Sequence, residues 1–159
     1  MAKDNPELND ILIIGVVGGI AYFGIVKPIL NSLDVGNTQG QADYDTQMSL
    51  PQQQNPFSQN YNYSTTNLSF TPQQYSDFSD SIYSNLGYLW IGEQPILDIF
   101  SQLKNKNDVA ALTQVMSQTQ GVDLLPFLKK GRSFTPFDNG ISKDALSTII
   151  HEVNALPSQ

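Results

Sequence analysis

Apolar side chains recur at steps of three and four residues along the second half of the chain, which is the period of a helix with one buried face. The first such run follows Thr71 and the last ends at Leu156. The pattern predicts five short amphipathic helices around a common core in residues 72–159. The apolar positions, run by run, are Tyr75, Phe78, Ile82, Tyr83 and Leu86; Ile96, Leu97, Ile99, Phe100 and Leu103; Val109, Leu112, Val115 and Met116; Leu124, Leu125, Phe127 and Leu128; and Leu146, Ile149, Ile150, Val153 and Leu156.

Residues that favour helix ends mark the limits of these runs. Thr71 followed by Pro72 and Gln74 predicts a capped start, because Thr71 can accept a backbone N–H while Gln74 reaches back to it. The other predicted boundaries are Gly87 closing the first helix, Asn107 with Asp108 capping the third, Gly121 beginning and Gly131 ending the fourth, and Ser142 capping the fifth with Asp144 in its first turn.

A continuous apolar run, ILIIGVVGGIAYFGIVKPIL, occupies residues 11–30 and carries no charge before Lys27. About 20 helical residues extend roughly 30 Å, the thickness of a bilayer's hydrocarbon core. We therefore predict an N-terminal transmembrane helix in a domain of residues 1–30. The alternative is a buried core helix, but the remaining chain is too small and too polar to surround it. The predicted membrane-spanning positions include Ile11, Ile14, Gly15, Gly19, Tyr22, Phe23, Lys27 and Leu30.

The residues around this span favour a retained single-pass anchor. Lys3 is outnumbered by three acids and no small-residue cleavage site follows the span, which argues against a signal peptide. Gly15 and Gly19 have the spacing that lets two helices approach closely, so self-association through the span is one expectation and a chance spacing is the other. The lone Lys3 weakly favours translocation of the carboxy-terminal side.

Residues 31–71 are rich in Gln, Asn, Ser, Thr and Tyr and hold few aliphatic side chains. This composition predicts an extended linker or arm. Within it, the alternation from Tyr61 to Phe70 is typical of a strand that pairs with another protein's sheet edge, with Tyr61 and Tyr63 as candidate partner contacts. A tether without partner contacts and a docked strand both fit this pattern.

The charges are unevenly distributed within a net charge of -7. Residues 31–103 contain no Lys or Arg, which disfavours nucleic-acid binding because phosphate contacts require basic side chains. Lys129, Lys130 and Arg132 form a small basic patch. Such residues commonly complement the dipole at a helix end, and a contact with anionic lipid headgroups is the functional alternative.

The sequence favours a role other than catalysis. It contains no cysteine and one histidine, His151, so thiolate metal sites, disulfides and histidine-rich metal sites are not expected. The acidic pairs lie in the predicted arm or on a polar helix face, where solvated carboxylates are usual, and no Gly-rich phosphate loop follows a strand. We predict no catalytic residue, no metal site and no cofactor.

The order of residues from Ser81 to Met116, with VDLLPFLKKG and DALSTIIHEVNAL after it, resembles one repeat of the annexin family. The resemblance extends from about Thr71 to Leu156 and implies a five-helix unit. The calcium loop of that family is missing, since Tyr88, Leu89 and Trp90 replace its glycine-rich carbonyl ligands and Lys130 lies near the expected acid. Trp90 is expected in the core, or as an aromatic tip with Tyr88 and Leu89 that contacts a membrane or protein partner.

An uncleaved anchor, a polar arm and a small helical module together resemble the minor membrane-anchored proteins of lipid-containing bacteriophage virions. This architecture implies a structural protein that links a bilayer to a capsid or other shell protein, in the internal membrane of a virion. The alternative is a bacterial envelope protein whose annexin-like module scaffolds or senses. A small channel-forming or lysis protein is a third class, but the span lacks a polar face.

Overall fold

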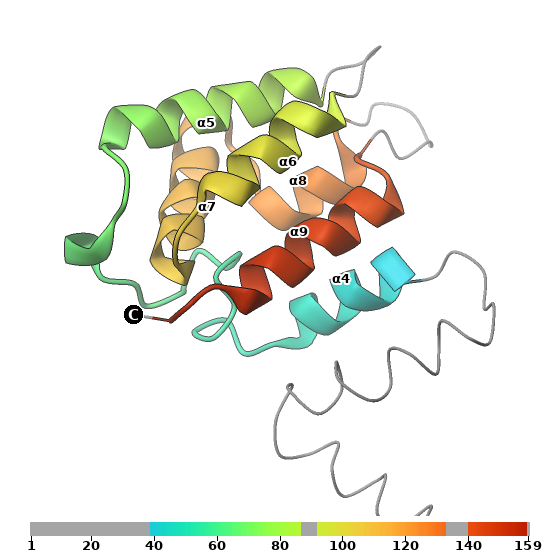
Figure 1. Cartoon of the computed structure of the whole chain (residues 1–159), viewed down its shortest axis with the longest axis horizontal. Helices are drawn as coiled ribbons and strands as arrows, with labels where there is room; N and C mark the ends of the chain where they lie inside the picture. The colour runs from blue at the N-terminus through green and yellow to red at the C-terminus, as the bar shows by residue number, and fades with distance from the viewer. Residues whose placement is uncertain (1–38, 87–91, 133–139, 159) are drawn as a thin grey trace, which may run out of the picture. The chain divides into compact units, whose positions relative to one another are not determined.

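The computed structural model describes residues 39–86, 92–132 and 140–158, and the regular elements in these ranges are helices (Figure 1). One compact unit spans Thr38–Gln159. The predicted mainly helical fold class is confirmed for the part of the chain that is described. The elements are α4 (Gln39–Ser49), the 3₁₀ turn η2 (Thr65–Asn67), α5 (Pro72–Asn85), α6 (Glu93–Gln102), α7 (Lys106–Gln120), α8 (Leu124–Lys130) and α9 (Lys143–Ala155).

Helices α5 to α9 correspond to the five predicted runs, and several of their ends are as the sequence predicts. Thr71 and Gln74 form a reciprocal capping box at the start of α5. Ser142 accepts a hydrogen bond from the N–H of Ala145 at the start of α9, and Gly131 follows the last residue of α8. Local sequence therefore determines these boundaries.

Two predicted boundaries are wrong. The N-cap of α7 is Asn105 rather than Asn107, because the Asn105 side chain accepts from the N–H of Asp108. Gly121 does not begin α8. It ends α7 in the left-handed conformation (φ 68°) that glycine adopts without a Cβ clash, and Asp123 lies at the N-cap of α8.

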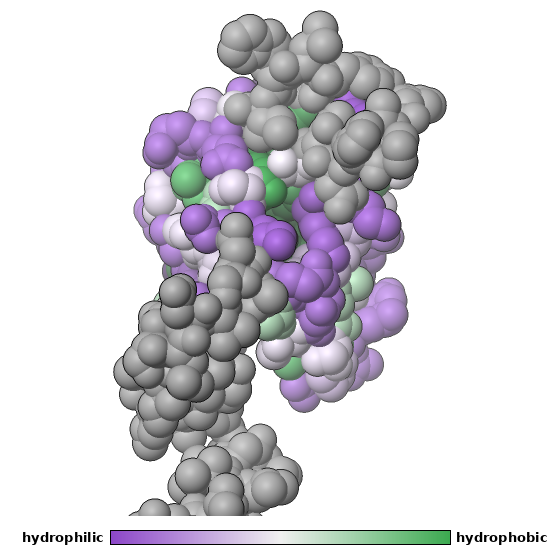
Figure 2. Space-filling model, turned by 90° about the vertical axis from the view of Figure 1, so that its right-hand side faces the viewer, coloured by the Kyte–Doolittle hydropathy of each residue, from purple (hydrophilic) through white to green (hydrophobic). Residues whose placement is uncertain are grey.

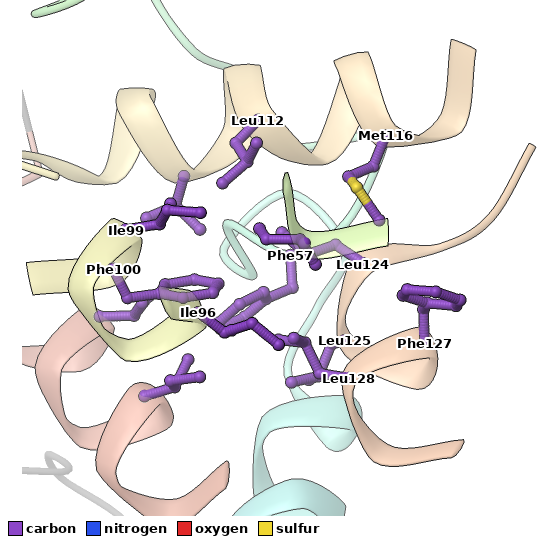
Figure 3. Close-up of a cluster of buried hydrophobic side chains, with 14 of the residues drawn as sticks. Phe57, Ile96, Ile99, Phe100, Leu112, Met116, Leu124, Leu125, Phe127 and Leu128 are labelled. Carbon is purple, nitrogen blue, oxygen red and sulfur yellow. The ribbon is translucent and has the colours of Figure 1, made fainter. Parts of the chain in front are cut away.

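The core lies where α6, α7 and α8 converge, with α9 closing one side. Figure 3 shows Leu112 and Met116 of α7 pointing toward side chains of α6 and α8. Helix α5 contacts α6 and α7, while α9 contacts α6 and α8. The labelled residues all have less than one tenth of their surface exposed, as is typical of a close-packed interior; they are Phe57, Ile96, Ile99, Phe100, Leu112, Met116, Leu124, Leu125, Phe127 and Leu128.

The predicted extended arm of residues 31–71 is wrong over its described part. Residues 39–49 form helix α4, which packs against α9 although its sequence has almost no apolar face. Phe57, from the irregular segment after α4, is buried in the core, with its ring centroid 6.2 Å from that of Phe100. The predicted strand from Tyr61 to Phe70 instead contains η2. Residues 39–71 are therefore part of the folded unit.

Several predictions lie outside the described residues. The transmembrane segment, from Ile11 to Leu30, is one of them, and Gly87 as the end of α5 is another. Within residues 39–86, 92–132 and 140–158, none of the helices combines the length and apolarity needed to cross a bilayer.

Candidate functional site

Four of the six Lys and Arg side chains carried by the described residues gather at one end of the unit, which we call the basic end and define as Lys129, Lys130, Arg132 and Lys143. At this end α4 and α9 begin and α8 ends (Figure 1). The described residues seen from this side are mostly hydrophilic, with a smaller apolar area among them (Figure 2).

Aromatic rings hold two of these cations. The Arg132 guanidinium lies 3.6 Å from the ring centroid of Tyr83, and Tyr83 stacks on the buried ring of Phe127 at 5.4 Å. The Lys129 ammonium lies 4.0 Å from the ring centroid of Tyr44 in α4. Each contact is a cation–π interaction, which restricts the side chain without neutralising its charge. Lys129 and Lys130 also occupy the last turn of α8, where positive charge complements the helix dipole.

The backbone brings the parts of the basic end together. The N–H of Ile141 donates to the Leu128 carbonyl at 2.9 Å, which ties the start of α9 to α8. A Cβ built on Gly40 would lie 2.2 Å from the Lys143 carbonyl oxygen, so the absence of a side chain at Gly40 permits α4 to approach α9. Glu93 accepts hydrogen bonds from the N–H and hydroxyl of Ser142, which joins α6 to the same region.

A second group joins α4 to the middle of α9. Ser147 and His151 lie one turn apart, and both contact the Asp43 carboxylate: the Ser147 hydroxyl donates to it, and His151 Nε2 lies 3.3 Å from Oδ2. In a nucleophilic triad the imidazole lies between the hydroxyl and the carboxylate. Here the carboxylate is the shared partner, which makes the group a polar clasp between two helices.

A third polar group is buried beneath the segment before α5. Asp108 is fully buried and accepts hydrogen bonds from the Tyr75 hydroxyl at 2.7 Å, the Ser69 N–H at 2.9 Å and the Lys104 N–H at 2.9 Å. Burial by itself would raise the pKa of Asp108, but these donors together hold that pKa below its ordinary value. Burial, followed by the hydrogen bond to Asp108, raises the pKa of Tyr75. The group fastens residues 69–75 to the start of α7.

Two of the five predicted partner or membrane contacts, Tyr61 and Tyr63, lie in the described residues. The Tyr63 hydroxyl donates to Gln114 at 2.9 Å and its ring packs on the core, so Tyr63 makes contacts within its own unit. Tyr61 is partly exposed nearby. Tyr88, Leu89 and Trp90 lie outside the described residues, between Leu86 and Gly92.

The sequence indicated Lys129, Lys130 and Arg132 as a basic patch but missed their companions. Lys143 was not recognised as part of the patch because it follows the predicted helix cap Ser142. Tyr44 was not recognised because its segment was predicted to be a linker. The Asp43 clasp was missed because its acid and its histidine belong to different predicted domains. In the described part of the chain, no three of the side chains that commonly bind metals lie close enough together to hold an ion.

No protein-family model matches the chain, and no curated protein or solved structure is significantly similar to it. The functional argument therefore depends on the residues of this chain.

Proposed function

We propose that the chain is a membrane-anchored structural protein that links a bilayer to a protein shell, as a minor component of a bacteriophage virion. The observation that carries the proposal is the uncharged apolar run from Ile11 to Val26, extended to Leu30, ahead of a compact unit that begins at Thr38. Such a run partitions into lipid, whereas the unit has a hydrophobic core made from its own residues. Anchoring and protein contact would thus be separate tasks of separate segments.

The exposed side chains after α4 support a protein partner. Between Pro51 and Asn60 the exposed positions are mostly uncharged amides, including Gln52, Gln53 and Gln54. Amides both donate and accept hydrogen bonds, and they lose less solvation than charges do when a partner covers them. This surface suits a shell protein better than a nucleic acid, which needs basic side chains. We also propose that the chain is not an enzyme, and that α5–α9 are related to a single annexin repeat without its calcium loop.

Membrane extraction and particle purification test this proposal with one matched variant. The full chain is expected to stay in the pellet after alkaline carbonate treatment, and the variant lacking residues 11–30 is expected in the supernatant. In phage-producing cells the full chain should co-purify with particles and follow either the extracted lipid or the shell when detergent is added. Carbonate release of the full chain would contradict the anchor. Membrane retention without particle association would favour the bacterial envelope alternative.

A further inference from the structure

We propose that the basic end binds the phosphate groups of anionic lipids and holds the helical unit with that end against the bilayer. The inference deepens the proposed function and rests on it, because the anchor brings the unit close to a membrane. It assigns one partner, an anionic lipid surface, to Lys129, Lys130, Arg132 and Lys143.

Arg132 is the best-prepared phosphate ligand of the four. Its guanidinium lies on Tyr83, which is itself stacked on Phe127, so the plane of the group is fixed before any ligand arrives. Its Nε is buried and has no hydrogen-bond partner among the described residues. A planar guanidinium can donate two parallel hydrogen bonds to phosphate oxygens, and prior ordering lowers the entropy lost on binding. Because Nε is buried and the ring of Tyr83 covers one face, we infer that the phosphate contact is made through the terminal Nη groups.

The lysines extend the same surface. Lys129 is held over Tyr44, Lys130 is exposed beside it, and Lys143 is exposed at the start of α9. Lysine acts as a flexible point charge that can follow headgroups as they move. A rigid arginine among mobile lysines is suited to a lipid surface, where the positions of the phosphates are not fixed.

The segment between the predicted membrane span and α4 is short. Eight residues, Asn31–Thr38, separate the last predicted membrane residue from Gln39, and they reach at most about 30 Å when fully extended. The chain enters the unit in the first turn of α4, where Gly40 meets the backbone of Lys143. The field of an anionic membrane acts only within about 10 Å of its surface, and the basic end includes the start of α4, where the preceding chain joins the unit.

Acidic side chains at the same end limit the attraction without reversing it. Asp43 and Asp45 lie in the first two turns of α4, Glu93 begins α6, and Asp144 is in the first turn of α9. Of these, Glu93 is hydrogen bonded to Ser142, and Asp43 contacts Ser147 and His151. Four bases balance four acids here. The other described residues carry two bases, Lys104 and Lys106, against six acids: Asp77, Asp80, Asp98, Asp108, Asp123 and Glu152. An anionic surface therefore repels the rest of the unit and favours the basic end.

The absence of cysteine permits a direct test with the full chain in vesicles. Gln94→Cys and Gln102→Cys each introduce one labelling site near opposite ends of α6, and both positions are exposed. A fluorophore on each variant is quenched by a lipid that carries a quencher at its headgroup. The vesicles are made of phosphatidylcholine alone or of phosphatidylcholine mixed with phosphatidylglycerol, and flotation is recorded for each preparation.

In the anionic vesicles we expect the label at position 94 to be quenched severalfold more than the label at position 102. In phosphatidylcholine alone the two should be quenched similarly. Lys129→Gln, Lys130→Gln and Arg132→Gln together should remove the difference in quenching. Each basic charge changes the ratio of molecules with the basic end toward the membrane to those with it turned away by about fivefold. The matched pair Lys104→Gln and Lys106→Gln, at the opposite end of the unit, should leave it unchanged.

The outcomes separate this inference from the anchor. Flotation with both vesicle types and equal quenching at the two positions would overturn the basic-end contact while leaving the anchor intact. Flotation with anionic vesicles alone, abolished by the triple substitution, would support the basic end and overturn the anchor. Flotation with neither type would overturn both. A quenching difference that survives the triple substitution would show that other residues orient the unit and would overturn the inference.

Discussion

Helices α5 to α9 and the segment from Gln39 to Thr71 belong to one folded unit, yet different forces hold them. The helices contribute nearly all of the buried apolar side chains, whereas the segment contributes Phe57. Four more of its apolar side chains are partly buried against the core: Tyr44, Tyr63, Leu68 and Phe70. Many of its other contacts are polar, including the buried pair in which Gln47 Nε2 donates to Asn55 Oδ1 at 2.9 Å and Asn55 Nδ2 donates to the Gln47 carbonyl at 2.9 Å. One part is thus a conventional core, and the other is a polar belt around it.

A segment can therefore be integral to a fold without a periodic apolar pattern of its own. Each buried hydrogen bond contributes about 1 kcal/mol net, but breaking one partner leaves the other unsatisfied at greater cost. The belt is therefore held by several hydrogen bonds that each contribute little and by the burial of Phe57, which contributes more. Single substitutions can separate these contributions.

Phe57→Ala should lower the stability of the unit more than the other belt substitutions. The side chain is 5% exposed and packs on Phe100, so its removal should destabilise the unit by about 3 kcal/mol, close to the cost of Phe100→Ala. Phe57→Leu, which keeps most of the volume, should cost about 1 kcal/mol. Urea unfolding followed by circular dichroism measures all three. A cost below about 1 kcal/mol for Phe57→Ala would show that the belt does not share the cooperative unfolding of the helices.

The next effect is that of Asp108→Asn, which places an amide where the carboxylate accepts from Tyr75, Ser69 and Lys104. The NH2 group of the asparagine then takes the place of one accepting oxygen and faces a donor, so we expect a loss of about 2 kcal/mol at neutral pH. The exposed Asp98→Asn provides a matched control and should stay within about 0.5 kcal/mol of the unsubstituted chain.

The same substitution has a pH signature. Hydrogen bonds hold the pKa of Asp108 below its ordinary value, so the carboxylate contributes stability above the unfolded pKa of about 3.9. That contribution is lost as the pH falls through the lower pKa of the folded state. Asp108→Asn should therefore flatten the acid side of the stability profile measured between neutral pH and about pH 2. An unchanged acid slope would contradict this role for Asp108.

The helices α5 to α9 could be predicted because periodic apolar faces and local caps determine them. Thr71 and Ser142 cap through residues within one turn, which are visible in the sequence. The N-cap of α7 was misassigned because Asn105 and Asn107 are both suitable by residue type. The choice depends on Asp108, whose side chain is engaged by the distant Tyr75.

Helix α4 and the aromatic partners of the basic end could not be predicted in this way. The α4 sequence, QGQADYDTQMS, shows no apolar period. The helix packs on α9 through close backbone approach at Gly40 and through Asp43, which leave no periodic signal in the sequence. Tyr44 becomes a partner of Lys129 only after that contact forms. Three basic residues of the site were therefore evident as a short run, while its geometry required the tertiary structure.

The smallest and sharpest expected effect is that of Gly40→Ala, because its sign distinguishes a docked belt from a tether. In a helix that contacts nothing, alanine is favoured over glycine by about 1 kcal/mol. In this unit the new Cβ would lie 2.2 Å from the Lys143 carbonyl oxygen, a backbone atom that cannot rotate away. Overpacking of this kind costs roughly 1–3 kcal/mol, so the net result should be a destabilisation of about 1 kcal/mol.

Hydrogen exchange locates that loss. The amides of α4 should exchange faster in Gly40→Ala. The amides of α7 should change little, because α7 packs on α5 and α8 rather than on α4. Thr46→Ala, at an exposed position in the same helix, provides the matched control and should not accelerate exchange in α4. If Gly40→Ala instead slows exchange and stabilises the chain, α4 does not rest on α9. The polar belt would then be a tether, and Lys129 would lose the aromatic support that Tyr44 gives it.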